Sequence, residues 1–307
     1  MITALAGGVG AAKFLQGLIK VHPEKDTTII VNTGDDIELY GLHISPDLDI
    51  VTYTLADIVD EKKGWGVKND TFHWLDMIQK YGYETWFKIG DKDLATHFYR
   101  TQLLKEGYSL TEITRKICRH LSLDMKILPM TDDRFQTRIV TDRGNVHFQE
   151  YLIKRGAQDK VLNVVFDGAE KAKPAPRVID SILNAKLIVI CPSNPIVSIG
   201  PILSVKNVRE ALRKAKAKVV AISPIIRGAP LKGPADKLMR GLGLEVSAYS
   251  VANLYRDFVD VFIIDNMDSD EEKRIESLGL KVVVTNTIMK TLQDKIELAE
   301  TAIRSAT

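Results

Sequence analysis

Short apolar runs alternate with amphipathic stretches along most of the chain. The first apolar run, Ile2–Ala6, ends at a glycine, and the stretch Ala11–Val21 that follows places its large apolar side chains on one helical face. A β-branched run, Thr27–Thr33, comes next and ends before Gly34. The order of strand, glycine loop, helix and strand predicts a βαβ unit of a parallel sheet.

The same alternation returns in the second half of the chain. Four near-continuous apolar runs are typical of strands that helices cover on both faces: "KLIVICP", "KVVAISP", "DVFIID" and "KVVVTNT". The stretches between and after them predict helices, several of which end at a glycine: "PRVIDSILNA", "SVKNVREALRK", "PADKLMRGLG", "SDEEKRIESLG" and "TLQDKIELAETAIRS". We therefore predict an α/β fold, with a Rossmann-like parallel sheet and helices on both faces.

The middle of the chain follows a different pattern. Residues 49–123 carry helical periodicity and no convincing strand, and Ser109 followed by Glu112 predicts a capping box at the start of one helix. We interpret 49–123 as a helical insertion that forms part of a binding site, between the two parts of a Rossmann-like core, 1–48 and 124–307. After it, "FQTRIVTD" and "NVHFQEYLIKRG" predict a β-hairpin.

Composition narrows the function classes. The chain has 307 residues, of which 45% are hydrophobic and 27% charged, as in an ordinary globular protein. A net charge of +2 offers no electrostatic case for nucleic acid or for an anionic membrane. Cys118 and Cys191 lack metal-like spacing and are most simply reduced thiols. We expect a cytoplasmic protein without nucleic-acid or membrane partners.

The unusual loops all follow predicted strands. They are the glycine loop, "NTGDD", "CPSNP", "SPIIRGAP" and "IDNMD". In an open parallel sheet the carboxyl ends of the strands share one edge, and ligands bind in the crevice at that edge. We expect these loops to meet there.

The glycine loop "ALAGGVGAAKFLQGL" contributes Gly7, Gly8, Gly10 and Lys13 as candidate phosphate-binding residues. It is not a Walker A loop, because Phe14 follows the lysine. It is also a broken dinucleotide fingerprint, because Lys13 stands where the third glycine belongs. Backbone amides at a helix N-terminus beside a lysine favour an anion site; a tight turn with a surface lysine fits the same residues equally well.

The second loop, "VNTGDDIE", places Asp35 and Asp36 after the second predicted strand. Adjacent carboxylates suit Mg²⁺, which prefers oxygen ligands and shares them with substrate phosphates. The alternatives are a solvated acidic loop and, for one of the two carboxylates, the ribose-binding acid of a Rossmann protein.

Two later loops supply hydrogen-bond donors and positive charge. Ser193 and Asn194 lie in "CPSNPIVSIGPIL", and Arg227, Gly228 and Lys232 lie in "SPIIRGAPLKGPADKLM". Together they are suited to hold a diphosphate and a nucleoside. The prolines in both loops also fit plain rigid turns, a role compatible with binding.

With these loops in view, the sequence resembles the 2-phospho-L-lactate transferases of coenzyme F420 biosynthesis. The resemblance covers nearly the whole chain and rests on "AGGVGAAKFLQGL", "VNTGDDIELYGLHISPDLDIVTYTLAD", "NDTFHW", "WFKIGDKDLATHFYRTQLL", "CPSNPIVSIGPIL" and "SPIIRGAPLKGPADKLM". It implies transfer of a phospholactyl group from lactyl-2-diphospho-5′-guanosine to 7,8-didemethyl-8-hydroxy-5-deazariboflavin, with GMP released and coenzyme F420-0 formed. It also implies Mg²⁺ as cofactor and a homodimer. Some relatives use a phosphoenolpyruvyl donor instead, so both donors stay open.

The resemblance also implies that Asp49 and Lys88 contact the deazaflavin and serve the reaction there. Many relatives have arginine in place of Lys88, and lysine keeps the charge but lacks the planar fork. Asp49 equally fits the N-cap of a helix that begins at Ile50, and a carboxylate is a weak base unless its pKa is raised. His97 falls one helical turn after Asp93, which predicts a pair on a helix surface.

Two other functions compete with the transferase. One is a nucleotide-sugar-binding regulatory protein of a related family with a similar glycine loop; "WFKIGDKDLATH" argues against it, because we associate that motif with the transferases. The other is a nicotinamide-dependent oxidoreductase, which the broken fingerprint disfavours. Binding of a deazaflavin separates the transferase from both.

Overall fold

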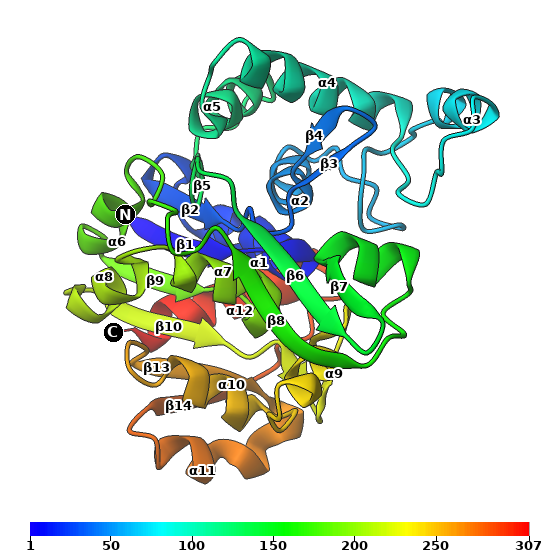
Figure 1. Ribbon diagram of the computed structural model, residues 1–307. Helices are drawn as coiled ribbons and strands as arrows, with labels where there is room; N and C mark the ends of the chain where they lie inside the picture. The colour runs from blue at the N-terminus through cyan, green and yellow to red at the C-terminus, as the bar shows by residue number, and fades with distance from the viewer. Residues whose placement is uncertain (307) are drawn as a thin grey trace.

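The computed structural model describes residues 1–306, and its centre is a seven-stranded parallel sheet (Figure 1). The strand order across the sheet is β5-β2-β1-β9-β10-β13-β14. The strand bounds are β1 Ile2–Ala6, β2 Thr27–Val31, β5 Lys126–Pro129, β9 Leu187–Ile190, β10 Lys218–Ile222, β13 Val261–Asp265 and β14 Lys281–Thr285. The predicted α/β class is confirmed, and six of these strands lie where the apolar runs predict them.

Alternating side chains of each central strand face two separate cores. In β1, Ile2, Ala4 and Ala6 belong to one core, and Leu5 belongs to the other. On the first face lie α1 (Gly8–Val21), α2 (Pro46–Leu55) and α12 (Leu292–Ser305). On the second face lie α6 (Val178–Leu183), α7 (Gly200–Ser204), α8 (Val208–Lys214), α10 (Ala248–Tyr255) and α11 (Glu272–Glu276). Helices therefore cover both faces, as predicted.

The sheet changes direction between β1 and β9. From β1 the chain runs outward through β2 to β5, and from β9 it runs the opposite way to β14. Loops after β1 and β9 therefore diverge to opposite sides and leave a crevice at the carboxyl edge, which is where open α/β sheets bind ligands.

The helical stretch in the middle of the chain is largely confirmed. Three helices, α3 (His73–Lys80), α4 (Asp91–Lys105) and α5 (Leu110–His120), lie at one end of the molecule beyond β5 (Figure 1). The capping box of Ser109 and Glu112 is present at the start of α5. The helix α2 starts before the predicted boundary at residue 49, and its Leu48 and Val51 pack into the same core as α1. The division into core and insertion stays a prediction.

Several short elements surround the main sheet. The predicted hairpin forms from β6 (Gln136–Thr141) and β7 (Gly144–His147), and β8 (Val161–Asp167), which we did not predict, adds a third antiparallel strand. Asn163 interrupts the apolar run of β8, which is exposed over part of its length. The remaining elements are β3 (Ile37–Leu39), β4 (Leu42–Ile44), β11 (Ile225–Ile226), β12 (Ala229–Pro230) and α9 (Ala235–Gly241). Across residues 1–306, no helix has the length and apolar character needed to cross a bilayer.

Candidate active site

A cavity of about 800 Å³ opens at the carboxyl edge of the sheet. Its walls come from the loops after β1, β2, β9, β10 and β14, together with α2, α4 and the segment before α4. The predicted loops do meet in one place, with the exception of "IDNMD", which contributes no lining residue in the described part of the chain. The cavity is therefore lined both by loops of the sheet and by residues from the predicted insertion, 49–123.

The glycine loop lies at the floor of this cavity, and its glycines permit close packing. A Cβ on Gly10 would lie 2.2 Å from the carbonyl oxygen of Pro192, in the loop after β9. A Cβ on Gly7 would lie 2.6 Å from Asp47 Oδ2. Gly8 has φ of +72°, a conformation that favours glycine. The loop is thus wedged between the β9 loop and α2, and Gly7, Gly8 and Gly10 all line the cavity.

Ser193 and Asn194 also line the cavity, as predicted, but their side-chain oxygens are used by the protein. Ser193 Oγ accepts a long hydrogen bond of 3.4 Å from the Gly7 N–H. Asn194 Oδ1 accepts from the N–H groups of Ile196 and Val197 at 3.0 and 3.3 Å. These two residues shape the loop as much as they face the cavity.

Two of the lysines that line the cavity lie near the glycine loop. Lys13, in the second turn of α1, is half-buried, and burial lowers its pKa, as do the nearby charges of Lys232 and Lys295. Lys232 follows β12 and lines the cavity with Gly233. Because these positive charges repel one another, an anion bound between them stabilises the folded protein.

Arg227 and Gly228 lie apart from the other predicted phosphate-binding residues. They form the turn between β11 and β12 and contribute no lining to the cavity within residues 1–306. The backbone N–H of Arg227 donates to Asp268 Oδ1 at 2.8 Å, and its side chain is exposed. Lys232 is the cation of this loop that faces the cavity.

Two buried carboxylates face the cavity from different segments. Asp35 follows β2, and Asp47 lies in the first turn of α2. Burial raises the pKa of Asp35 well above its usual range, and the charge of Asp47 raises it further. Burial likewise raises the pKa of Asp47 to about 7, although Asn32 Nδ2 donates to Asp47 Oδ2 at 2.9 Å. Asp35 Oδ1 has no hydrogen-bond partner within residues 1–306.

Asp36 lies behind this pair rather than in the cavity wall. Its Oδ2 accepts a hydrogen bond from Ser45 Oγ at 2.7 Å and lies 3.0 Å from His43 Nε2. The backbone carbonyl oxygen of Asp36 lies 3.1 Å from His147 Nε2, on β7. The small antiparallel sheet thus braces the loop that carries Asp35.

Asp49 lies one turn inside α2, so the N-cap interpretation is wrong: the helix begins at Pro46, with Ser45 at the N-cap position. The carboxylate lines the cavity but is only 6% exposed. Both of its oxygens accept hydrogen bonds from the guanidinium of Arg100 on α4. Asp49 is therefore held by a side chain 51 residues away.

His97 and Asp93 are buried, so the prediction of a surface pair is wrong. His97 is 2% exposed and lies between two carboxylates, with Nδ1 3.5 Å from Asp49 Oδ2 and Nε2 3.4 Å from Asp93 Oδ1. Asp93 Oδ1 also accepts from Tyr53 Oη at 2.8 Å. The pair is buried because its face of α4 packs toward α2.

Lys88 comes from the segment before α4 and reaches the same cavity. Its side chain is exposed, beside Trp86 and Phe87, which also line the wall. The structure thus brings Lys88 and Asp49 to one cavity with the glycine loop, the arrangement that the sequence predicts.

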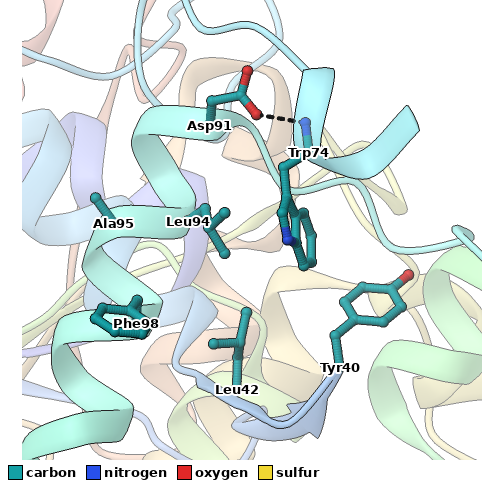
Figure 2. Close-up of a pocket in the computed structure, with 7 residues that line it drawn as sticks. All are labelled: Tyr40, Leu42, Trp74, Asp91, Leu94, Ala95 and Phe98. Carbon is teal, nitrogen blue, oxygen red and sulfur yellow. Dashed lines mark hydrogen bonds between the residues drawn. The ribbon is translucent and has the colours of Figure 1, made fainter. Parts of the chain in front are cut away.

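A second hollow, of about 420 Å³, lies between α4, the start of α3 and the segment from Tyr40 to Leu42 (Figure 2). Its wall is mostly apolar, with Tyr40, Trp74 and Phe98 prominent. The single carboxylate there, Asp91, accepts hydrogen bonds from the Trp74 and His73 N–H groups at 3.0 and 3.1 Å. Among the described residues, the only carboxylate that lines this hollow is therefore engaged in capping the start of α3.

Comparison with known proteins decides the family. The sequence model of the 2-phospho-L-lactate transferase CofD family matches residues 2–301. The chain belongs to this family. It is 43% identical to a phosphoenolpyruvate transferase of Kitasatospora aureofaciens, with 99% of this chain and 97% of that protein covered. It is 42% identical to a 2-phospho-L-lactate transferase of Methanocaldococcus jannaschii, with the same coverage.

Family membership makes the protein a transferase, and solved structures agree on the fold. A UPF0052-family protein of Bacillus halodurans superposes with a TM-score of 0.65 at 15% identity, and 98% of each chain is covered. At that identity the likeness concerns the fold alone.

Sequence reasoning missed three side chains in or behind the wall of this cavity: Asp47, Tyr53 and Arg100. Asp47 lies in the motif "SPDLD", two residues before Asp49, and proximity in that motif was the available signal. Arg100 follows Asp93 and His97 at helical spacing, so all three share one face of α4. The spacing indicates the shared face but not its partner on α2.

Proposed function

We propose that this transferase moves the 2-phospholactyl group of lactyl-2-diphospho-5′-guanosine to the ribityl 5′-hydroxyl of 7,8-didemethyl-8-hydroxy-5-deazariboflavin, a step of coenzyme F420 biosynthesis. A bond forms between the hydroxyl oxygen and the phosphorus that carries lactate, the diphosphate bridge breaks, and GMP leaves. The product is coenzyme F420-0. The observation that carries the proposal is a single cavity that joins cations, buried carboxylates and the insertion in a member of this family.

The donor binds at the glycine-loop end of the cavity. Lys13 and Lys232 supply positive charge for the diphosphate, and the N-terminal amides of α1 lie beside them. Phosphoryl-type transfer depends mainly on positioning and on charge neutralisation, and needs no covalent nucleophile. This end of the cavity is suited to both.

A magnesium ion fits beside Asp35 and Asp47. Both carboxylates are buried and interact unfavourably with each other, and Asp35 keeps an unpartnered oxygen among the described residues. Within residues 1–306 no three His, Cys, Asp or Glu side chains form a metal cluster, so phosphate oxygens and water would complete the coordination, as is usual for Mg²⁺. When bound, the ion neutralises charge on the diphosphate. Asp36 supports the loop from behind.

The acceptor binds at the insertion end. Lys88, in the segment that leads into α4, and Asp49, on α2, both line this wall. Because Asp49 is committed to Arg100, we assign it a binding role, in which it accepts hydrogen bonds from the acceptor. A substrate held between this wall and the glycine loop is oriented toward the donor and shielded from water, which otherwise competes as nucleophile.

Relatives of nearly equal identity carry names for two donors, phosphoenolpyruvate and 2-phospho-L-lactate. The decisive experiment incubates the protein with the deazaflavin, Mg²⁺ and either the guanylated phospholactate or the guanylated phosphoenolpyruvate, and identifies products by mass spectrometry. We expect F420-0 and GMP from the lactyl donor at the higher kcat/KM. Preference for the enolpyruvyl donor contradicts the donor assignment, and no product from either donor contradicts the function.

A variant of the metal site accompanies that experiment. Asp35→Asn removes a charge that faces the proposed ion. Because Asp35 Oδ1 has no hydrogen-bond partner in the described chain, the substitution breaks no hydrogen bond of that oxygen. We expect turnover to fall by at least a hundredfold at limiting Mg²⁺, with GDP binding retained. Unchanged turnover at limiting Mg²⁺ contradicts the metal role of Asp35.

A further inference from the structure

Five buried polar side chains join α2 to α4 behind the acceptor wall. Asp49 and Tyr53 come from α2, and Asp93, His97 and Arg100 come from α4; none is more than 7% exposed. Four of them line the cavity, and Arg100 alone lies behind it. Arg100 can therefore influence the acceptor only through another side chain.

Arg100 holds Asp49 through both of its terminal nitrogens. Nη1 donates to Asp49 Oδ2 at 3.1 Å, and Nη2 donates to Asp49 Oδ1. This two-point contact fixes the plane of the carboxylate as well as its position. Nη1 also lies 3.3 Å from His97 Nδ1 and 3.4 Å from the carbonyl oxygen of His43. The guanidinium is thus locked in turn by its own neighbours.

The ion pair is poorly explained by folding stability alone. Removing two charges from water is costly, and a buried ion pair is often no more stabilising than apolar side chains of the same size. Arg100 Nε is in addition buried with no hydrogen-bond partner in the described chain. The carboxylate of this pair lines a cavity, so the pair is better explained by a role of that carboxylate in binding than by stability.

We propose that Arg100 is a positioning residue, which fixes the Asp49 carboxyl group as an acceptor of hydrogen bonds from the acceptor substrate. This inference rests on the proposed function. Arg100 occupies one side of the carboxylate and His97 Nδ1 lies 3.5 Å from its Oδ2, while Asp49 also lines the cavity, where it can accept hydrogen bonds from bound groups. N–H and O–H groups of a polar heterocycle or of a polyol chain are recognised there, and substrate groups that only accept hydrogen bonds are disfavoured.

The test compares Arg100→Lys and Asp49→Asn with the double variant. Lysine keeps the charge but cannot form the fork. Four quantities are measured for each protein: the dissociation constant of the deazaflavin by its fluorescence, that of GDP by calorimetry, and KM and kcat for the acceptor at saturating donor. The matched control is Arg209→Lys, which breaks a similar two-point pair with Asp257 on the far side of the sheet.

We expect Arg100→Lys to raise the deazaflavin dissociation constant and the acceptor KM about tenfold, with the GDP dissociation constant changed less than twofold. The double variant should bind the deazaflavin no more weakly than Asp49→Asn, because both changes break one interaction. Arg209→Lys should leave both dissociation constants unchanged. Should Arg100→Lys not fold, Arg100→Gln combined with Asp49→Asn restores a neutral amide pair and is expected to bind the deazaflavin as weakly as Asp49→Asn.

The inference is wrong if Arg100→Lys leaves deazaflavin binding unaffected, or if the neutral pair of Arg100→Gln with Asp49→Asn restores it fully. It is also wrong if deazaflavin and GDP binding weaken together, or if the effects of Arg100→Lys and Asp49→Asn multiply in the double variant. Failure of the proposed function is distinguishable, because the unmodified protein then binds no deazaflavin at all.

Discussion

The buried carboxyl group of Asp47 lowers the stability of the folded protein to an extent that depends on pH. Removing its charge by substitution tests the electrostatics of the site. Burial raises its pKa from 3.8 to about 7, and the neighbouring charge of Asp36 adds to the rise, while Asn32 and Gly8 oppose it. The folded protein therefore binds a proton at this position more tightly than the unfolded chain does. Without a metal ion, the contribution of Asp47 to the free energy of unfolding falls as the pH rises from about 4 to about 7. This contribution is constant on either side of that window.

The magnitude follows from the shift. One pKa unit corresponds to 1.36 kcal/mol, so a rise of about 3 units destabilises the metal-free protein by about 4 kcal/mol above pH 7 relative to low pH. Between pH 5 and pH 8 the wild-type protein should therefore lose about 3 kcal/mol more stability than Asp47→Asn. Asparagine retains one oxygen, which can still accept the hydrogen bond from Asn32.

The assay is urea unfolding followed by tryptophan fluorescence at several pH values between 5 and 8, with EDTA present. The difference between the two proteins reports Asp47 together with its effect on Asp35, whose pKa the charge of Asp47 raises. Parallel stability profiles for wild type and variant refute the reasoning. We further expect Asp47→Asn to lose its stabilisation by Mg²⁺, since a bound ion would offset the repulsion between the Asp47 and Asp35 carboxylates.

Three further predictions concern other walls of the cavity. Lys232→Ala should weaken GDP binding about tenfold in calorimetry, because a charge-assisted contact is lost. Arg227→Ala, at the turn outside the cavity, should change GDP binding less than twofold. A larger effect of Arg227→Ala than of Lys232→Ala contradicts the placement of the diphosphate. Lys88→Ala should weaken deazaflavin binding, measured by fluorescence, about tenfold and GDP binding little, and a selective loss of GDP binding means that the two substrates are assigned to the wrong walls. Gly10→Ala places a Cβ 2.2 Å from the Pro192 carbonyl oxygen and should destabilise the fold by about 1–3 kcal/mol in thermal unfolding; an unchanged midpoint shows that the β1 and β9 loops separate freely.

Local pattern was sufficient for most of the fold. The strand Ile2–Ala6 is apolar at every position because helices cover both faces of the sheet, and such a run can be read without knowledge of its neighbours. The capping box of Ser109 and Glu112 likewise depends on residues three apart. The three-residue strands β3 and β4 were missed because segments so short carry too little periodicity to distinguish them from a loop.

The positions of the loops along the chain also predicted that most candidate residues lie at the carboxyl edge of the sheet. Asp35 and Ser193 both follow parallel strands, and the carboxyl ends of such strands share an edge whatever the details of packing. Within a loop, however, order does not decide which side chain turns inward. Arg227 and Lys232 lie five residues apart, and only the β11–β12 hairpin turns one away from the cavity and brings the other to its wall.

The chemistry of the site was decided by contacts between distant segments. Local sequence was enough to predict the α/β sheet, the glycine loop at its carboxyl edge and acidic and basic groups near that edge. Tertiary structure alone pairs Asp49 on α2 with Arg100 on α4, 51 residues apart, and burial in the folded chain raises the pKa of the Asp47 carboxyl group. Strand periodicity and loop order act over a few residues, whereas desolvation and ion pairing depend on which segments meet in three dimensions.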